Sequence, residues 1–370
     1  MKKIFKYKRI YILGLLPISY LLIFLAKHSD FFAEQVFARH IYKWVSQMVS
    51  VIFGLVPFSV AEILIYSLPL AGLFLIIRFI ILMIKDKENR KNRAIKGILN
   101  LFCMISILLF IFTITAGINY YRYPFSYYSG LEIKDSSVEE LYALTQNLAL
   151  QANDLRAKTT SVDESGVFKL SDGIYELADK ADEAMKALSE QYSVLGGLYA
   201  TPKPVLLSSM MSRTEITGIF FPFTMEANVN VDISDFFIPV TMLHELAHLR
   251  GFMREDEANY IAYLAGMESD STDIKYSSTM LAMITAGNAL YDKEPELYFT
   301  IRDQYSEGVL KDIRANSQYW QQYEDTVIST ISNKINDTYL KANAQVDGVQ
   351  SYGRMLDLLL AKFREEQNGN

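Results

Sequence analysis

Three long apolar segments in the first third of the chain constrain its fold more than any other feature. Residues 10–26 and 98–118 contain no charged side chain, and residues 60–84 contain only Glu62 and Arg78. A helix needs about 20 apolar residues to cross the hydrocarbon core of a bilayer. The sequence therefore predicts three transmembrane helices, with the lipid bilayer as a partner of the chain.

The charges divide the chain into two unlike parts. Residues 1–118 contain 15 Lys and Arg against 5 Asp and Glu, whereas residues 119–370 contain 21 against 37. We therefore predict a membrane domain over residues 1–118 and a separate domain over residues 119–370. The acidic second part would repel phosphate, which counts against nucleic acid as a partner.

The basic residues of the first part predict the topology of the spans. They gather before the first span, within residues 2–9, and between the second and third spans, within residues 85–96. Short loops rich in Lys and Arg remain in the cytoplasm. We expect a multi-pass protein of the cell membrane, with a cytoplasmic N-terminus and residues 119–370 outside the cytoplasm.

The loop between the first two spans, residues 27–59, carries an amphipathic pattern. Its large apolar side chains recur at helical spacing, at Phe37, Ile41, Trp44, Met48 and Ile52. Such a stripe is typical of a helix that lies on a membrane or packs against the spans. We interpret this helix as a structural cover rather than as a binding element.

Residues 119–370 are predicted to form a mainly α-helical α+β domain with a small edge sheet. Ser137 and Glu140 form a capping-box pattern at the start of the first helix. Apolar periodicity and breakers predict helices at 137–157, 172–192, 240–250, 255–267, 277–291, 294–307, 319–340 and 351–366. A short strand is expected at residues 205–207, and an edge strand or hairpin at residues 214–230.

The segment His244-Glu245-Leu246-Ala247-His248 is an H-E-x-x-H motif in a predicted helix. Positions i and i+4 lie on one helix face, so both imidazoles can reach one zinc ion, with Glu245 beside them as general base toward a water molecule. The competing interpretation is a solvated His and Glu pair, but the interleaved residues Leu246 and Ala247 are too apolar for a fully exposed surface.

A catalytic zinc site needs a third protein ligand and one open position. Cysteine is excluded, because the only cysteine is Cys103, in the third apolar segment. Acidic residues follow the motif directly, and either Glu255 or Glu257 could serve as the ligand. The same acidic residues could instead complement the dipole at the start of a helix.

At these residues the sequence resembles the gluzincin class of zinc peptidases, which have H-E-x-x-H on one helix and a glutamate ligand on the next. This resemblance implies a zincin-like fold, Glu255 as the third ligand, and Asn259 as the residue that orients a ligand imidazole. Glu257 remains the alternative ligand.

The chain also resembles a family of bacterial membrane proteins of unknown function over nearly its whole length. The three spans, residues 218–228, the motif with Glu255–Asn259, and residues 339–343 and 351–354 carry this resemblance. The family implies no activity of its own, so zinc and hydrolysis depend on the gluzincin-like motif.

Together these features predict a membrane-anchored zinc metallopeptidase that hydrolyses peptides or proteins of the cell envelope. The edge strand within residues 214–230 is placed to bind an extended peptide. Tyr352 and Arg354 are candidates to stabilise the oxyanion. The alternative is a non-catalytic envelope sensor or scaffold with a vestigial or structural zinc site.

Overall fold

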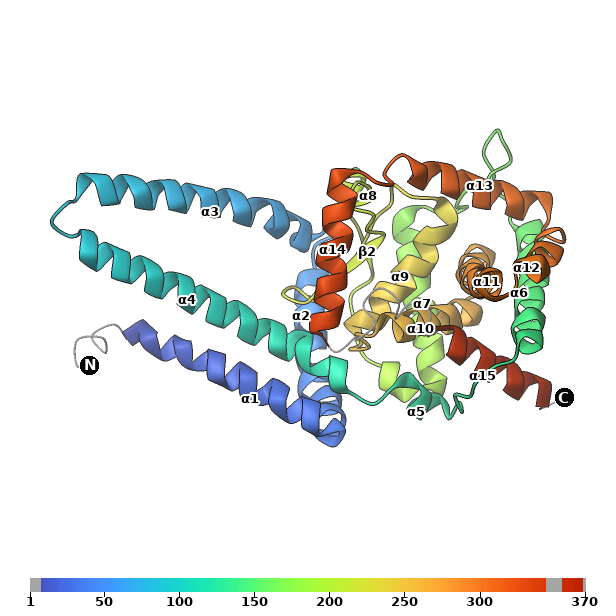
Figure 1. Ribbon diagram of the computed structural model, residues 1–370, viewed down its shortest axis with the longest axis horizontal. Coiled ribbons are helices and arrows are strands. Elements are labelled where there is room, and N and C mark those ends of the chain that lie inside the picture. Colours follow the sequence, from blue (N-terminus) through green and yellow to red (C-terminus); the bar gives the residue numbers. More distant parts are fainter. Residues whose placement is uncertain (1–7, 344–354, 369–370) are drawn as a thin grey trace.

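Three long apolar helices project from one side of a helical body in the computed structural model, which describes residues 8–343 and 355–368 (Figure 1). The first is η1 (Lys8–Gly14) continued by α1 (Leu15–His28), and the others are α3 (Val60–Lys85) and α4 (Arg90–Thr115). All three are long and apolar enough to cross a membrane, as the sequence predicted.

The third span differs from its predicted limits, 98–118. Helix α4 begins at Arg90 because Lys and Arg are good helix formers, so the helix continues beyond the apolar segment. It ends at Thr115, because Ala116 leaves the helical conformation and η3 (Gly117–Tyr121) follows. Hydropathy located the apolar segment, but it does not mark the ends of a helix.

The loop between the first two spans forms η2 (Phe32–Tyr42) and α2 (Lys43–Gly54). Trp44, Met48 and Ile52 lie on its exposed side, as expected, with 75%, 61% and 55% of their surfaces exposed. The prediction was wrong for Phe37, which is buried in the core. Its segment is π-helical, and these wider turns rotate Phe37 away from the stripe.

A three-stranded sheet lies beside the start of α3. Its strands are β1 (Lys203–Pro204), β2 (Gly218–Phe221) and β3 (Glu226–Val229), in the order β1-β3-β2. Strand β2 is antiparallel to β3 and forms one edge, which confirms the predicted hairpin. The strand predicted at residues 205–207 was wrong, because the backbone N–H groups of Leu206 and Leu207 donate to the Glu62 carboxylate instead.

The N-terminus of α3 is bonded directly to β3. The backbone N–H groups of Val60 and Ala61 donate to the Glu226 carboxylate, at 3.0 and 2.7 Å. Lys203 of β1 donates to the same carboxylate at 2.6 Å, and both side chains are buried. This junction holds one of the long apolar helices against the sheet.

The body is built from helices around α9 (Ile238–Leu249), which packs against α7 (Ile174–Gln191), α10 (Glu255–Glu268), α11 (Thr272–Lys293) and β3. Helix α6 (Val138–Lys158) packs on the far side of α11 and begins with the predicted capping box. Shorter elements connect these helices: α5 (Phe125–Ser129), η4 (Ser193–Leu195), α8 (Ser208–Ser212) and η5 (Asp235–Phe237). The predicted helices of this region are confirmed, with ends shifted by a few residues.

The C-terminal helices are shorter than predicted. Helix α12 (Pro295–Arg302) ends before residue 307, and the stretch 319–340 is divided between α13 (Glu307–Gln321) and α14 (Val327–Ala342). Asp325 has a φ of 55°, and Thr326 caps α14, so the chain turns between the two helices. The last helix is α15 (Met355–Asn368); the predicted start at residues 351–354 lies outside the described residues.

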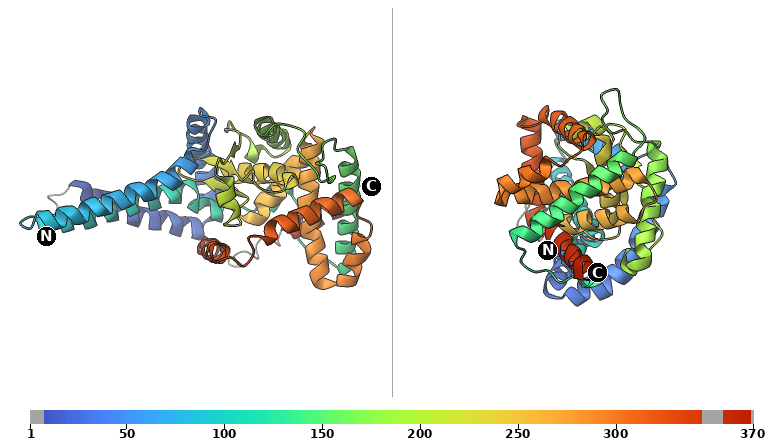
Figure 2. Two further views of the ribbon diagram at one scale, coloured as in Figure 1. Left: turned by 90° about the horizontal axis from the view of Figure 1, so that it is seen from above. Right: turned by 90° about the vertical axis from the view of Figure 1, so that its right-hand side faces the viewer.

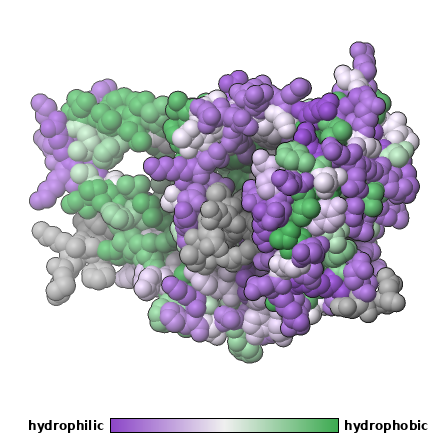
Figure 3. All heavy atoms as spheres, turned by 45° about the vertical axis from the view of Figure 1, so that its right-hand side comes forward, coloured by the Kyte–Doolittle hydropathy of each residue, from purple (hydrophilic) through white to green (hydrophobic). Residues whose placement is uncertain are grey.

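The surface repeats the division found in the sequence. Apolar side chains gather on the long projecting helices, whereas the body presents a mostly polar surface (Figure 3). The structure therefore supports association of the projecting helices with a membrane.

Replacing Glu226 with alanine tests the junction between α3 and the sheet. The change leaves Lys203 buried without its ion partner, and we expect a loss of about 3–5 kcal/mol in the free energy of unfolding in detergent. Glu176→Ala, which removes an exposed ion pair with Lys180, is the matched control and should cost about 0.5 kcal/mol or less. Equal losses for the two variants would contradict the assigned role of Glu226.

Candidate metal centre

The H-E-x-x-H segment lies in α9, which is buried almost throughout. Pro239 occupies the first turn, and the backbone N–H of Val240 donates to Ser277 Oγ at 2.9 Å. Gly251 ends the helix with a φ of 89°, and its N–H donates to the carbonyl oxygen of His248 at 2.8 Å. A Cβ at Gly251 would approach the ring of Tyr42 to 2.9 Å, so this close turn requires glycine.

His244, His248 and Glu255 converge between α9 and α10. Glu255 Oε2 lies 3.2 Å from His244 Nε2 and 3.6 Å from His248 Nε2. One ligand atom from each of the three residues lies within 4.8 Å of the others. Each side chain retains 10–14% of its exposure, so the group is accessible from one side.

The separations of Glu255 from the two imidazoles suit a tetrahedral metal site. Zinc bonds of about 2.0–2.2 Å at tetrahedral angles separate neighbouring ligand atoms by about 3.3–3.6 Å. The two distances from Glu255 lie close to this interval. Two imidazoles and one carboxylate are a ligand set found at catalytic zinc sites that keep a fourth position open.

Hydrogen bonds at Nδ1 fix the orientation of both imidazoles. His244 Nδ1 lies 2.7 Å from Asn259 Oδ1, and His248 Nδ1 lies 2.7 Å from the carbonyl oxygen of Phe252. Because both partners accept, each ring carries its proton on Nδ1 when it is neutral and presents the Nε2 lone pair toward Glu255.

The pKa shifts of Glu255 and His248 indicate that a positive charge between these side chains is stabilised. Burial raises the pKa of Glu255, but the charge of His248 and the hydrogen bonds of both imidazoles outweigh burial and hold the pKa far below its usual range. Burial lowers the pKa of His248, but attraction by Glu255 dominates and raises it to about 9. A bound cation would replace the proton on His248.

Glu245 lies beside the three residues, between α9 and β2. Its carboxylate is buried and accepts from the backbone N–H of Phe220, and burial raises its pKa. Its Oε2 has no hydrogen-bond partner within the described part of the chain. A Cβ at Gly218 would lie 2.4 Å from Glu245 Oε1, so β2 reaches this position only with glycine.

Glu257, the alternative ligand, points away from the imidazoles. Its Oε1 accepts from the backbone N–H of Phe125 at 2.9 Å, and Arg254 Nε lies 3.3 Å from its Oε2. Burial raises the pKa of Glu257 to about 7 despite Arg254. The structure groups Glu255, and not Glu257, with the two histidines.

The proposed oxyanion residues Tyr352 and Arg354 lie outside the described residues. A different tyrosine, Tyr339 of α14, lies near the group. Burial raises the pKa of Tyr339, and the negative charge of Glu255 raises it further. Its hydroxyl accepts from the Tyr120 hydroxyl at 3.0 Å. Sequence reasoning did not assign Tyr339 to the site, although it belongs to residues 339–343, which carried the family resemblance.

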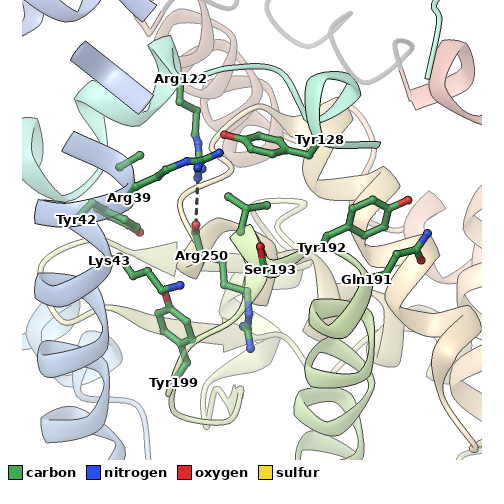
Figure 4. Close-up of a pocket in the computed structure, with 12 residues that line it drawn as sticks. Arg39, Tyr42, Lys43, Arg122, Tyr128, Gln191, Tyr192, Ser193, Tyr199 and Arg250 are labelled. Carbon is green, nitrogen blue, oxygen red and sulfur yellow. Dashed lines mark hydrogen bonds between the residues drawn. The ribbon is translucent and has the colours of Figure 1, made fainter. Parts of the chain in front are cut away.

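A polar cavity of about 330 Å³ lies behind the end of α9 (Figure 4). The Tyr42 hydroxyl donates to the carbonyl oxygens of His248 and Leu249, at 3.3 and 3.1 Å. Arg122 donates to the carbonyl oxygen of Arg250 at 3.3 Å and forms a buried ion pair with Glu34. Residues next to the spans thus hold the helix that carries both histidines.

Comparisons with known proteins identify a family but no characterised relative. No curated protein and no solved structure matches the chain. A family model described as "Protein of unknown function (DUF3810)" matches residues 37–360, which extend from η2 into α15. The chain therefore belongs to this family of unknown function.

Proposed function

We propose that the protein is a membrane-anchored zinc-dependent metallopeptidase with a gluzincin-like catalytic domain. The convergence of His244, His248 and Glu255, with Glu245 beside them, is the observation that carries this proposal. The zincin-like fold rests on the same arrangement, a motif helix packed between a small sheet and the helix that supplies the third ligand.

The residues have distinct roles in the proposed reaction. Zn²⁺ bound by the two imidazoles and Glu255 would supply the Lewis acidity that acidifies water and polarises a peptide carbonyl. Glu245 Oε2, which is buried and without a partner in the described structure, accepts the proton of the attacking water and transfers it to the leaving amine. The pKa of Glu245, raised by burial, suits this transfer.

Two further elements suit peptide hydrolysis. Strand β2 is an edge of the sheet and touches Glu245 through Gly218 and Phe220, so an extended peptide paired with β2 would pass the metal ligands. The Tyr339 hydroxyl is hydrogen-bonded to the Tyr120 hydroxyl at 3.0 Å and lies near the charge of Glu255. We assign Tyr339 to the oxyanion, beside the candidates Tyr352 and Arg354, which lie outside the described residues.

We also propose that the body lies outside the cytoplasm of a cell-membrane protein whose N-terminus is cytoplasmic. The basic turn between α3 and α4 and the start of α1 lie at the same end of the projecting helices, opposite the body (Figure 1). Both basic segments can therefore remain on one side of the bilayer while the body remains on the other.

Zinc binding by purified full-length protein tests the ligand assignment. We expect one zinc ion per chain, and Glu255→Gln should weaken zinc binding more than the about 10–100-fold typical of residues that only orient a ligand. Glu257→Gln is the matched control and should retain wild-type affinity in a competition titration with a chelating dye. If Glu257→Gln lost zinc and Glu255→Gln retained it, the assignment of Glu255 would be overturned.

Hydrolysis of a peptide library tests the role of Glu245. We expect Glu245→Gln to bind zinc normally but to cleave peptides about 10²–10⁴-fold more slowly, because the general base is lost. Wild-type protein that binds zinc and cleaves nothing would instead indicate the alternative, a sensor or scaffold with a structural zinc site.

The variant Tyr339→Phe tests the oxyanion assignment. Removal of one oxyanion donor should lower kcat about 10²–10³-fold and leave KM and zinc affinity nearly unchanged. Tyr291→Phe, at an exposed tyrosine of α11, is the control. A change in KM alone would place Tyr339 in substrate binding rather than in oxyanion stabilisation.

A further inference from the structure

Helix α14 carries an apolar stripe that the body leaves uncovered. Val327, Ile331 and Ile335 follow one another at intervals of four residues and therefore lie on one helix face. They are 77%, 55% and 64% exposed, and Ile328 beside them is 50% exposed. Single exposed apolar residues are common, but a continuous stripe along one helix indicates a surface that something covers.

The position of α14 indicates what covers this stripe. The ring of Tyr339, near its C-terminal end, contacts Phe112 of α4 at a centroid distance of 6.2 Å, and its hydroxyl bonds Tyr120 just beyond α4. Helix α14 thus lies where a membrane-spanning helix ends. It runs across the direction of the spans rather than along it (Figures 1 and 2).

Helix α2, which also lies at the body end of the spans, presents a second apolar stripe. Trp44, Met48, Ile52 and Leu55 are 55–80% exposed and recur at intervals of three or four residues. Figure 2, left, shows α2 and α14 on opposite sides of the spans, both seen nearly end-on. Two amphipathic helices that flank spans and lie across them have the geometry of elements that rest in a bilayer interface.

The candidate metal centre lies on the body side of these two helices and has neighbours at both of them (Figure 1). Tyr339 of α14 lies near Glu255, while Tyr42, directly before α2, bonds the carbonyl oxygen of His248. Strand β3 of the same sheet bonds the start of α3 through Glu226. Residues around the centre are therefore attached to elements that flank the long apolar helices.

We infer that α14 and α2 lie in the bilayer interface, and that the metal centre acts on polypeptide segments held next to the bilayer. The substrate class, which rests on the proposed peptidase function, is thus the extended juxtamembrane segment of a membrane-anchored polypeptide. The interface supplies such a segment at high local concentration, whereas a free peptide must arrive from solution.

Fluorescence quenching of the full-length protein in vesicles tests the position of α14. A single dye is attached through Ile331→Cys in a Cys103→Ser background, and the vesicles contain lipids brominated along the acyl chains. The matched control is Leu150→Cys on α6, which is equally exposed, at 53%, but lies at the far end of the body. We expect strong quenching at position 331 and none at position 150.

Two results would overturn the position assigned to α14. Equal, weak quenching at both positions would show that α14 lies in water. Quenching between dyes that rises with the ratio of protein to lipid, without quenching by bromine, would show that a second copy covers the stripe.

Cleavage of one peptide in two forms tests the substrate class. The peptide is offered free in solution or tethered to the vesicle by an acyl chain. We expect wild-type protein to cleave the tethered form at least about tenfold faster. The variant Ile331→Asn/Ile335→Asn should lose this preference and retain cleavage of the free peptide, whereas Leu150→Asn should retain both.

The outcomes separate this inference from the proposed function. Cleavage of neither form by wild-type protein would reject the peptidase proposal, and quenching at position 331 would still decide where α14 lies. Equal cleavage of both forms, or an unchanged preference in the double variant, would overturn the assigned substrate class while the peptidase proposal stands.

Discussion

Buried carboxylates with charged or backbone partners are the interactions on which the architecture depends. Glu226 joins the start of α3 to the sheet, and Glu34, in the loop between the first two long helices, pairs with Arg122 beyond the third. Asp312 of α13 is buried against Arg156 of α6. A buried carboxylate is strongly destabilising unless its partners are present, so each of these contacts forms only when both segments are correctly docked. The spans and the body consequently behave as parts of one structure, although their compositions suit two different solvents.

The same attachment gives the candidate metal centre a rigid frame. Helix α9 is buried except at His244, and its C-terminal end is held by Tyr42 and Arg122, which lie next to the spans. The imidazoles are fixed in turn by Asn259 and by the carbonyl oxygen of Phe252. Ligand geometry in such a site depends on residues that never touch the metal, because they set the direction of each lone pair. The positions of both histidines are thereby coupled to the segments next to the long apolar helices.

The sequence predicted the features that depend on local pattern. Apolar length identified the spans, Ser137 and Glu140 identified a helix start, and His244 and His248 share a face because of helical periodicity. Features that depend on tertiary contacts could not be predicted in this way. The chain at Leu206 leaves the sheet because it meets Glu62, and Phe37 turns inward because its helix is π-helical. Tyr339 lies near Glu255 although 84 residues separate them in the sequence, and no local pattern encodes that proximity.

Glu255 and Glu257, at the start of α10, show what a sequence pattern can and cannot predict about a ligand. Residues at i and i+2 of a helix point about 200° apart, so Glu255 and Glu257 cannot both face α9. Helical geometry therefore allows only one of the two glutamates to face the histidines. Which glutamate does so depends on the direction that the chain takes between Gly251 and α10. In the structure this direction turns Glu257 toward Arg254 and the start of α5, where its burial raises its pKa to about 7. The two carboxylates therefore have different surroundings, since Glu255 lies with the two histidines and Glu257 bonds the start of α5.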